Sequence, residues 1–513
     1  MKTFGRIVIY ANYTENQLLK GSQDKRDAKV IDILSNSIDI HNQNRTEIEY
    51  LQDYLYGDQD IKNKVKLTRT DINNKGVENW AWAFQDWKKA FLLGKPIQYA
   101  PLDNVANQEI SSLNKYVTFE DKDQKDQELY EDMFTVGRGF RYVNATAITE
   151  DDEAPFEILN FDVKNTEVVY SSGARHEQLL AFAETSKKYI VQEINPETNE
   201  KEWITKYYNE YTVYTRDMMY LIDDKNGSFR ILKRTPIIHQ THLITEYYFN
   251  RKRMGLLEIG KDIFDDINYI ENLDKDDIES FVNSIMVFTN AEVDKKGMDA
   301  IKEYGAVSIK STDQKKASVE LLQSRLKSID TQIYYLRKIS ALHSILSVPQ
   351  ATSSGEMSNA ETGKAMLTGQ GFTSSSIRVE NEEKSFKKCD RNSLKVILKI
   401  CRNASASDIK NLKVSDIEIK FSRDLSDNLL VKTQALINLM TANIPPEIAN
   451  AVINLFSDPV AVTKLQEEYI KKKQEITQKL QNQQGNDGNE DGKKVKEQNN
   501  NMTKTTENQN QEQ

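Results

Sequence analysis

The chain has 513 residues, of which 38% are hydrophobic and 29% charged, and its formal net charge is −9 at pH 7. This composition is typical of a soluble protein of several domains, with no run of about eighteen apolar residues that could span a membrane and no signal-peptide core. Proteins that bind DNA tightly are usually basic, whereas this chain is acidic. Nucleic acid is therefore either not a partner or a partner that is bound only weakly.

The first hundred residues predict two helices. Residues 46–61 form a helical pattern closed by Gly57, and residues 76–100 predict a helix that ends at Gly94. Aromatic side chains recur in the second helix at the spacing of a buried stripe, namely Trp80, Phe84, Trp87 and Phe91. A stacking platform for nucleic acid is the alternative, but no basic groove accompanies these residues, so we favour a core role.

The next segments predict a helix followed by strands. Residues 126–148 indicate a helix, a turn at Gly137 and Gly139, and a strand. From about residue 155 to 249, alternating β-branched and aromatic residues predict an antiparallel sheet with short turns such as residues 224–227.

The middle of the chain changes to long helical patterns. Residues 256–285 predict one helix with an apolar stripe of Leu256, Ile259, Ile263, Ile267, Ile270 and Leu273. The opposite face is acidic and includes Asp262, Asp265, Asp266, Glu271, Asp274, Asp276, Asp277 and Glu279. Such carboxylates usually form a solvated face.

A small α/β unit separates this helix from a second one. We expect a strand at 285–289, a helix at 294–304 and a strand at 305–310, followed by a helix from 319 to 346. One long helix would thus lead away from the rest of the protein and the other would lead back to it, with a compact α/β unit between them.

The stretch VPQATSSGEMSNAETGKAM, residues 348–366, ends like a phosphate-binding loop. The preceding glycine, Gly355, lies too far from Gly363-Lys364, and Ala365 replaces the required hydroxyl residue, so nucleotide binding is not expected. A third helical pattern runs from 359 to 402, interrupted at Gly369 and Gly371.

The C-terminal third predicts a strand at 415–423 and then several helical segments. From about residue 481 the chain consists mostly of Asn, Gln, Lys and Glu, and this composition predicts disorder.

No catalytic constellation is recognisable, so we expect no enzyme, no cofactor and no metal site. Cys389 and Cys401 lie twelve residues apart in one helical pattern, which disfavours a disulfide and indicates a reducing compartment. His239 and His242 fall in a segment that we interpret as a strand, where positions three apart point to opposite faces.

The order of these segments resembles the SPP1-type portal family of tailed bacteriophages. The resemblance rests on EYLQDYLYGDQDI (49–61), AFLLGKPIQYA (90–100), MFTVGRGFRYV (133–143), DIFDDINYIENLDKDDIESF (262–281) and ETGKAML (361–367). It covers about residues 45 to 470. The Asn/Gln-rich tail and the tryptophans at 80 and 82 depart from the family's pattern.

The resemblance implies the α+β portal fold, assembled as a ring, usually of twelve subunits. Its parts would be a mixed α/β wing, a long-helix stem, a small α/β clip, a tunnel loop, a kinked spine helix and a helical crown. The corresponding residues would be 1–250 with 363–422 (wing and spine), 251–284 and 319–346 (stem), 285–318 (clip), 347–362 (tunnel loop), 423–480 (crown) and 481–513 (disordered tail).

The resemblance also suggests which residues meet other molecules. A tunnel loop that touches moving DNA would carry weakly binding side chains, here Gln350, Thr352, Ser353, Ser354, Glu356, Ser358 and Asn359. The acidic helix would line the channel with Asp262, Asp266, Asp276 and Asp277, which would let the duplex slide. Asp294, Lys295 and Lys296 would be clip contacts.

The implied function is a DNA channel at the capsid vertex, through which the genome is packaged and later ejected. Implied partners are further copies of the chain, double-stranded DNA, the large terminase subunit, major capsid or scaffold protein and a head–tail adaptor, with no membrane, in a virion assembled in the host cytoplasm. A nucleic-acid-processing enzyme with a helical insertion is the alternative, and another virion component is a third possibility.

Overall fold

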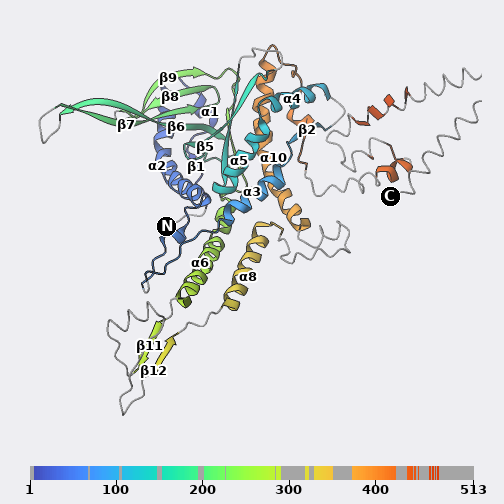
Figure 1. Ribbon diagram of the computed structural model, residues 1–513. Helices are drawn as coiled ribbons and strands as arrows, with labels where there is room; N and C mark the ends of the chain where they lie inside the picture. The colour runs from blue at the N-terminus through green and yellow to red at the C-terminus, as the bar shows by residue number, and fades with distance from the viewer. Residues whose placement is uncertain are drawn as a thin grey trace, which may run out of the picture. The chain divides into compact units, whose positions relative to one another are not determined.

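The computed structural model describes most of the chain up to residue 422. The described ranges are 5–67, 70–102, 107–146, 153–194, 201–225, 227–282, 285–289, 318–322, 328–349 and 372–422, with short helical pieces between 436 and 472. The chain divides into two compact units, Met1–Asp424 and Leu425–Gln513. The first unit combines helices and sheets (Figure 1), which confirms the α+β class predicted from the sequence.

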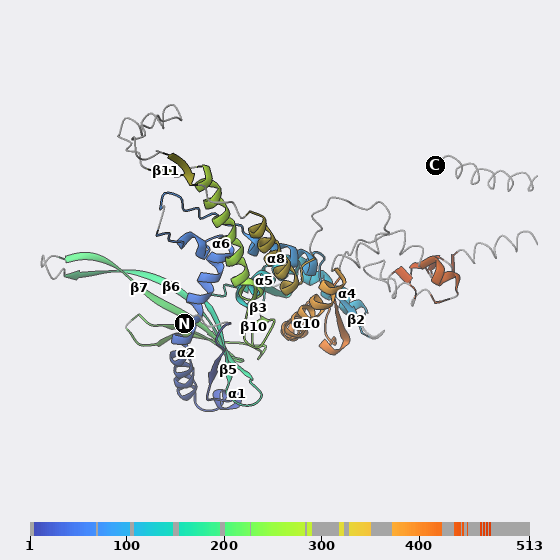
Figure 2. The same ribbon diagram turned by 90° about the horizontal axis from the view of Figure 1, so that it is seen from below.

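A six-stranded sheet forms one part of the first unit, with strand order β1-β5-β6-β7-β8-β9. Its strands are β1 (Ile9–Ala11), β5 (Thr166–Ser171), β6 (Gln178–Ile194), β7 (Lys201–Tyr214), β8 (Met218–Asp223) and β9 (Arg230–Pro236). All neighbours pair antiparallel, as predicted, except β1, which pairs parallel with β5. The ends of β6 and β7 extend away from the other elements as a long hairpin (Figure 1, Figure 2).

Two helices, α1 (Glu15–Leu19) and α2 (Gln23–Leu55), accompany this sheet. Val30, Ile33 and Leu34 of α2 pack in one buried cluster with side chains of β5 to β8. α2 has 33 residues and begins much earlier than the helix predicted at 46–61. It ends just before Gly57, whose φ of 97° supports the predicted helix end.

A second, three-stranded sheet has the order β10-β3-β4. Its strands are β3 (Arg138–Ala145), β4 (Phe156–Phe161) and β10 (Ile244–Tyr248). The predicted helix–turn–strand unit is confirmed, because α5 (Lys122–Val136) leads through Gly137 into β3. Gly137 has φ 81°, and a Cβ there would lie 2.2 Å from the Arg253 carbonyl oxygen, so this turn requires glycine.

The predicted aromatic stripe lies on α3 (Trp80–Leu93), which is one of the helices around the main core. Phe84 is buried, and Trp80, Trp87 and Phe91 pack against the same cluster. Trp82, on the other side of the helix, is 49% exposed. This pattern confirms a core role for the stripe rather than a stacking platform.

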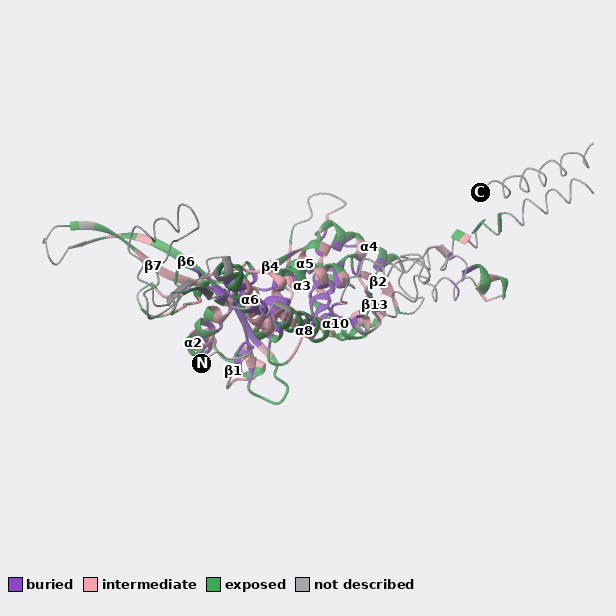
Figure 3. Cartoon of the chain, turned by 60° about the horizontal axis from the view of Figure 1, so that its bottom comes forward, coloured by how far each residue is buried: buried purple, intermediate pink, exposed green. Residues whose placement is uncertain are grey.

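The long helix α10 (Phe372–Asn403) packs against β10 and β3. The helix carries both buried and exposed residues (Figure 3). α4 (Asn107–Phe119) packs beside β2 (Gln98–Pro101), which pairs antiparallel with β13 (Ile417–Lys420). The strand predicted at 415–423 is thereby confirmed, although it is shorter than expected. Short 3-10 helices lie at η1 (Asp60–Asn63) and η2 (Val414–Asp416).

A buried charge cluster fixes α10 to the rest of the core. The Asp390 carboxylate accepts hydrogen bonds from Tyr99 (2.8 Å) and Tyr247 (3.0 Å), and Lys122 lies 3.2 Å away. Burial alone would raise the pKa of Asp390, but Lys122 and Arg141 outweigh it and lower that pKa. Because an unpaired buried charge is costly, this cluster specifies how α10 docks.

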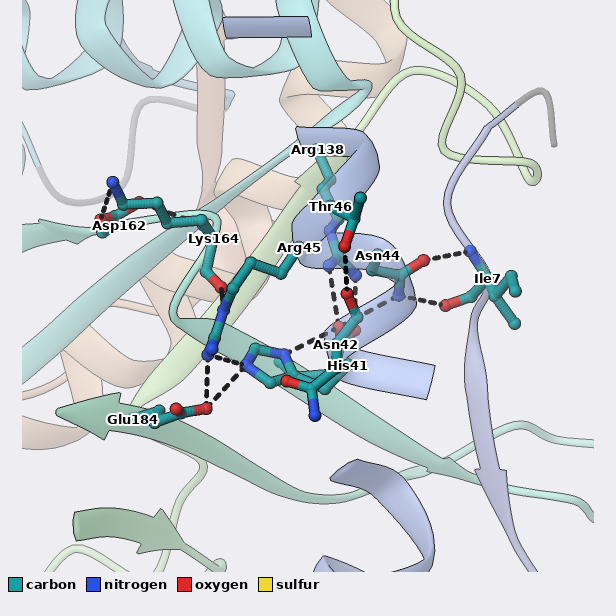
Figure 4. Close-up of polar contacts among 11 residues, drawn as sticks. Ile7, His41, Asn42, Asn44, Arg45, Thr46, Arg138, Asp162, Lys164 and Glu184 are labelled. Carbon is teal, nitrogen blue, oxygen red and sulfur yellow. Dashed lines mark hydrogen bonds and ion pairs between the residues drawn. The ribbon is translucent and has the colours of Figure 1, made fainter. Parts of the chain in front are cut away.

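A second buried cluster joins α2 to the sheets (Figure 4). Arg138 of β3 binds Glu167 of β5 through two hydrogen bonds of 2.5 and 2.8 Å. His41 Nε2 lies 3.2 Å from Glu184, which also pairs with Arg45. Burial alone would lower the pKa of His41, but the nearby carboxylates of Glu167 and Glu184 outweigh it and raise that pKa above 6.5.

The predictions about the paired histidines and the two cysteines differ in outcome. His239 and His242 lie between strands, in a turn, and not on a strand as predicted. His239 contacts Asn403, whereas His242 contacts Glu15, so the two rings have separate partners. Cys389 and Cys401 lie on α10, as predicted, and are free and buried.

Candidate functional site

A pair of long helices carries a small two-stranded sheet at its far end (Figure 1). α6 (Leu256–Val282) has 27 residues and is therefore about 40 Å long, and α8 (Ser328–Leu346) returns beside it. The sheet pairs β11 (Ile285–Thr289) with β12 (Ser318–Leu322). The paired long helices and the strand at 285–289 are confirmed.

The start of the second helix was predicted wrongly. Residues 319–322 belong to β12, where Val319 lies opposite Phe288 and Leu321 opposite Met286. Pairing with an apolar strand distant in sequence overrides the local helical spacing. The helix and strand predicted at 294–304 and 305–310 lie outside the described residues.

The contact between α6 and α8 is apolar and close. Phe264 and Ile267 of α6 are buried, as are Leu342 and Leu346 of α8. A Cβ on Gly260 would lie 3.2 Å from Leu342 Cδ1, so glycine allows the helices to approach here. Each fully buried side chain of this size contributes roughly 1.5–3 kcal/mol.

A second face of α6 is polar and holds an extended segment of the chain. The Asn268 side-chain oxygen accepts a hydrogen bond from the Glu78 amide at 2.8 Å. Asn272 accepts from the Gly76 amide at 2.6 Å and donates to the Gly76 carbonyl at 2.7 Å. We call these contacts, together with those of Asp276 below, the polar ladder.

The spacing explains why the polar ladder fits. Its rungs lie four residues apart on the helix, at 268, 272 and 276, and two residues apart on the extended segment, at 78, 76 and 74. Four helical residues rise about 6 Å, and two extended residues rise about 6.6 Å. A helix and an extended chain can therefore stay in register over three rungs.

Asp276 forms the third rung and is 2% exposed. It accepts hydrogen bonds from the Asn74 amide (2.7 Å), Lys64 (2.7 Å) and Lys66 (3.3 Å). Burial alone would raise the pKa of Asp276, but the bonds from Lys64, Asn74 and Lys66 lower it to about 2. Asp276 is therefore not part of an exposed acidic face, which corrects the expectation that it faces a channel.

The outer face of α6 mixes acidic and apolar residues. Positions spaced by three or four residues share this face, and they are Ile259, Asp262, Asp266, Tyr269, Leu273 and Asp277. All are exposed except Asp266, which is partly buried and whose carboxylate binds Lys338 of α8 at 2.6 Å. The sequence had placed Ile259 and Leu273 on the buried stripe. They are solvent-facing because α8 and the polar ladder each cover another face of α6 and leave this one uncovered.

The segment predicted as a tunnel loop begins at a fixed point. The chain leaves α8 through Ser347, which has φ 58°, and the Val348 amide donates to the His343 carbonyl at 3.0 Å. Arg378 of α10 donates to Ser347 Oγ at 2.7 Å and to the Ser344 carbonyl at 2.9 Å. One arginine thus joins the end of α8 to the start of α10.

The other predicted site residues cannot be placed. The tunnel-loop residues Gln350, Thr352, Ser353, Ser354, Glu356, Ser358 and Asn359 lie outside the described residues, as do Asp294, Lys295 and Lys296. Sequence reasoning missed Arg378 and the asparagines of the polar ladder. Across the part of the chain that the structure describes, no three His, Cys, Asp or Glu side chains gather as a metal site, and no helix is long and apolar enough to cross a membrane.

Comparison with known proteins identifies the class to which this architecture belongs. Residues 34–486, nearly the whole chain, match the family described as phage portal protein, SPP1 Gp6-like. The chain belongs to this family of phage portal proteins. A comparison with curated proteins finds no match.

Family membership fixes the broad role of the chain. It is a bacteriophage portal protein, a capsid component that takes part in genome packaging. The family is one of structural proteins, and it implies an oligomeric ring at the capsid vertex of the virion.

Proposed function

We propose that twelve copies of this chain close into a ring whose central channel carries double-stranded DNA. The terminase motor drives the genome inward through this channel, and head–tail connector proteins bind later for ejection. Energy comes from the terminase, since the portal itself performs no catalysis. The ring assembles in the host cytoplasm.

The outer face of α6 is the observation that carries this proposal. Tyr269 is 51% exposed and Leu273 37% exposed, although α6 already buries one face on α8 and another on the polar ladder. On α8, Ile333 and Leu336 are also about half exposed. Large apolar side chains gathered on long helices indicate an interaction surface, and a repeated head-to-tail contact closes into a ring.

The elements divide among the parts of a portal subunit. Residues 1–250, with α10 and β13, form the wing and spine, and α6 and α8 form the stem. Residues 285–318 form the clip, with Asp294, Lys295 and Lys296 as its proposed contacts to the motor and the adaptor. Residues 347–362 form the tunnel loop, 423–480 the crown, and 481–513 a disordered tail.

The channel wall is weakly acidic in this proposal. Asp262 and Asp277 are exposed on α6, and Asp266 is partly exposed beside Lys338. They share the outer face with the apolar side chains that pack on the next subunit, so in the ring they lie at the channel-side edge of that contact. Carboxylates repel the phosphates of a duplex, which carries one charge per about 1.7 Å, so DNA slides and is not trapped. The tunnel-loop side chains Gln350, Thr352, Ser353, Ser354, Glu356, Ser358 and Asn359 would add only weak contacts.

The assembly is tested by placing charge on the outer face of α6. The double variant Ile259→Glu and Leu273→Glu is expected to fold as the wild type does by circular dichroism, because both side chains are already exposed. Light scattering should show that it no longer forms the wild-type oligomer. The matched control is Ile238→Glu, which changes an 82% exposed residue outside the stem and should leave the oligomer intact. An unchanged oligomer in the double variant would contradict this interface.

A further inference from the structure

The exposed side of α10 carries a row of basic residues. We call this row the basic stripe; its members are Lys384, Lys388, Arg391, Lys395, Lys399 and Arg402. Their spacings of 4, 3, 4, 4 and 3 residues follow the helical repeat, so the six lie along one side of the helix. Eighteen residues of helix separate the first from the last, a length of about 27 Å.

The basic stripe is nearly the whole exposed surface of this part of the helix. Between Lys384 and Arg402, where every residue is described, Asn392 is the only exposed residue that is not basic. The only carboxylate in this stretch is Asp390, which is fully buried in the cluster with Lys122 and Arg141. A chain with net charge −9 therefore concentrates positive charge on one line.

The cations of the basic stripe lack counter-charges within the described part of the chain. None of the six has a carboxylate oxygen within 4.0 Å among the described residues. Their hydrogen bonds go to neutral oxygens, such as Lys388 to the Tyr248 hydroxyl at 3.2 Å and Lys399 to the Gln240 carbonyl at 2.9 Å. Burial first, and then the charges of Arg216 and Arg402, lower the pKa of Lys399.

The chemistry of the basic stripe favours a polyanion over a protein partner. Protein interfaces depend on buried apolar and aromatic anchors. No large hydrophobic side chain is exposed between residues 384 and 402; the nearest one on α10 is Ile377. Contacts to a phosphate backbone require no apolar anchor. They require several cations in a row, so that each can lie near a phosphate of an extended nucleic acid.

We propose that the basic stripe of α10 binds the phosphate backbone of duplex DNA. The identity of the polyanion rests on the proposed function, in which DNA passes through the ring, but the stripe is a contact separate from the stem and from the tunnel loop. A duplex 27 Å long carries about 16 phosphate charges, more than enough to engage six cations. The contact is independent of sequence and weakens with salt.

The test is a salt titration of DNA binding with the full-length protein. A fluorescein-labelled 30-base-pair duplex serves as the probe, and fluorescence anisotropy gives the dissociation constant at several salt concentrations. The variant Lys384→Gln, Arg391→Gln and Lys395→Gln removes three exposed cations. Its slope of log K against log salt should be smaller by about 2.7, equivalent to about 500-fold weaker binding at about 0.1 M salt.

Two further variants keep the test specific. The control Lys188→Gln, Lys201→Gln and Lys233→Gln removes the same charge from exposed lysines on the six-stranded sheet and should retain wild-type affinity. The variant Lys384→Arg, Arg391→Lys and Lys395→Arg keeps the charge and should bind as the wild type does. Ring formation, imaged on the same samples, tests the proposed function separately.

Three results would overturn the basic stripe as a DNA contact. One is a wild-type protein that forms rings and binds no duplex. Another is an equal loss of affinity in the stripe variant and in the sheet control. The third is a stripe variant that keeps its DNA affinity and loses binding to the acidic surface of a capsid protein, which would assign the stripe to a protein partner.

Discussion

The substitution Asp276→Asn tests the polar ladder most sharply, because it keeps the shape of the side chain and removes its charge. The amide oxygen can still accept from the Asn74 amide, but the ion pairs to Lys64 (2.7 Å) and Lys66 (3.3 Å) are lost. The pKa of this carboxyl falls from 3.8 to about 2. This difference corresponds to roughly 2.4 kcal/mol, which screening by nearby solvent reduces to about 1–2 kcal/mol.

The assay is hydrogen exchange at the three amides that the polar ladder protects, those of Asn74, Gly76 and Glu78. A loss of about 1–2 kcal/mol should speed their exchange by about 5- to 30-fold. The neighbouring variant Asp277→Asn is the control, because Asp277 is exposed, and it should leave the three amides unchanged. Equal protection in the wild type and in Asp276→Asn would refute this account of the ladder.

The same carboxyl predicts how the polar ladder responds to acid. Because the folded-state pKa of Asp276 is lowered, its stabilising contribution is present above pH 3.8 and is lost as the pH falls through about 2. Protection of the three amides should therefore decrease over this range in the wild type. In Asp276→Asn the decrease should be smaller.

Three other perturbations have defined outcomes. The pKa of His41 is raised, so its ion pairs stabilise the fold below pH 6.5 and are lost as the pH rises through the folded-state pKa. The difference in urea midpoint between the wild type and His41→Gln should therefore shrink with rising pH. Arg378→Ala should cost about 1–3 kcal/mol locally and speed exchange at the end of α8, whereas the exposed Lys384→Ala should not. Packaging should slow when the exposed acidic residues are made basic together, by Asp262→Lys, Asp266→Lys and Asp277→Lys, and wild-type packaging rates would contradict the weakly acidic channel.

Much of the fold could be predicted because local spacing carries it. The helical repeat indicated α6, α10 and the aromatic stripe of α3, and alternation indicated the strands between residues 155 and 249. Gly137 marked a turn that its surroundings require. These features depend on neighbouring residues, so a single sequence is sufficient to recognise them.

The parts that were missed depend on distant partners. Asn268, Asn272 and Asp276 visibly recur every four residues, but the segment that they hold lies about 200 residues away and has no periodic pattern of its own. The same reason explains Val319, whose strand is defined by pairing with Phe288. The two long helices were predicted, but which carboxylates of α6 are exposed could not be predicted from the residues of α6 alone.

The basic stripe was missed for a different reason, because all six of its residues and their helical spacing can be recognised from the sequence alone. The net charge of −9 averages over the whole chain and conceals a local line of six cations on α10. Counting charge along each helical face, with Asp390 recognised as buried, would have revealed it.

The central claim is a ring around DNA, and single-particle imaging of the purified full-length protein tests it most directly. We predict closed rings of twelve subunits, with α6 and α8 at the subunit contacts and a central hole wide enough for a DNA duplex. A stable monomer under virion-like solution conditions, or a ring closed at its centre, would contradict the account.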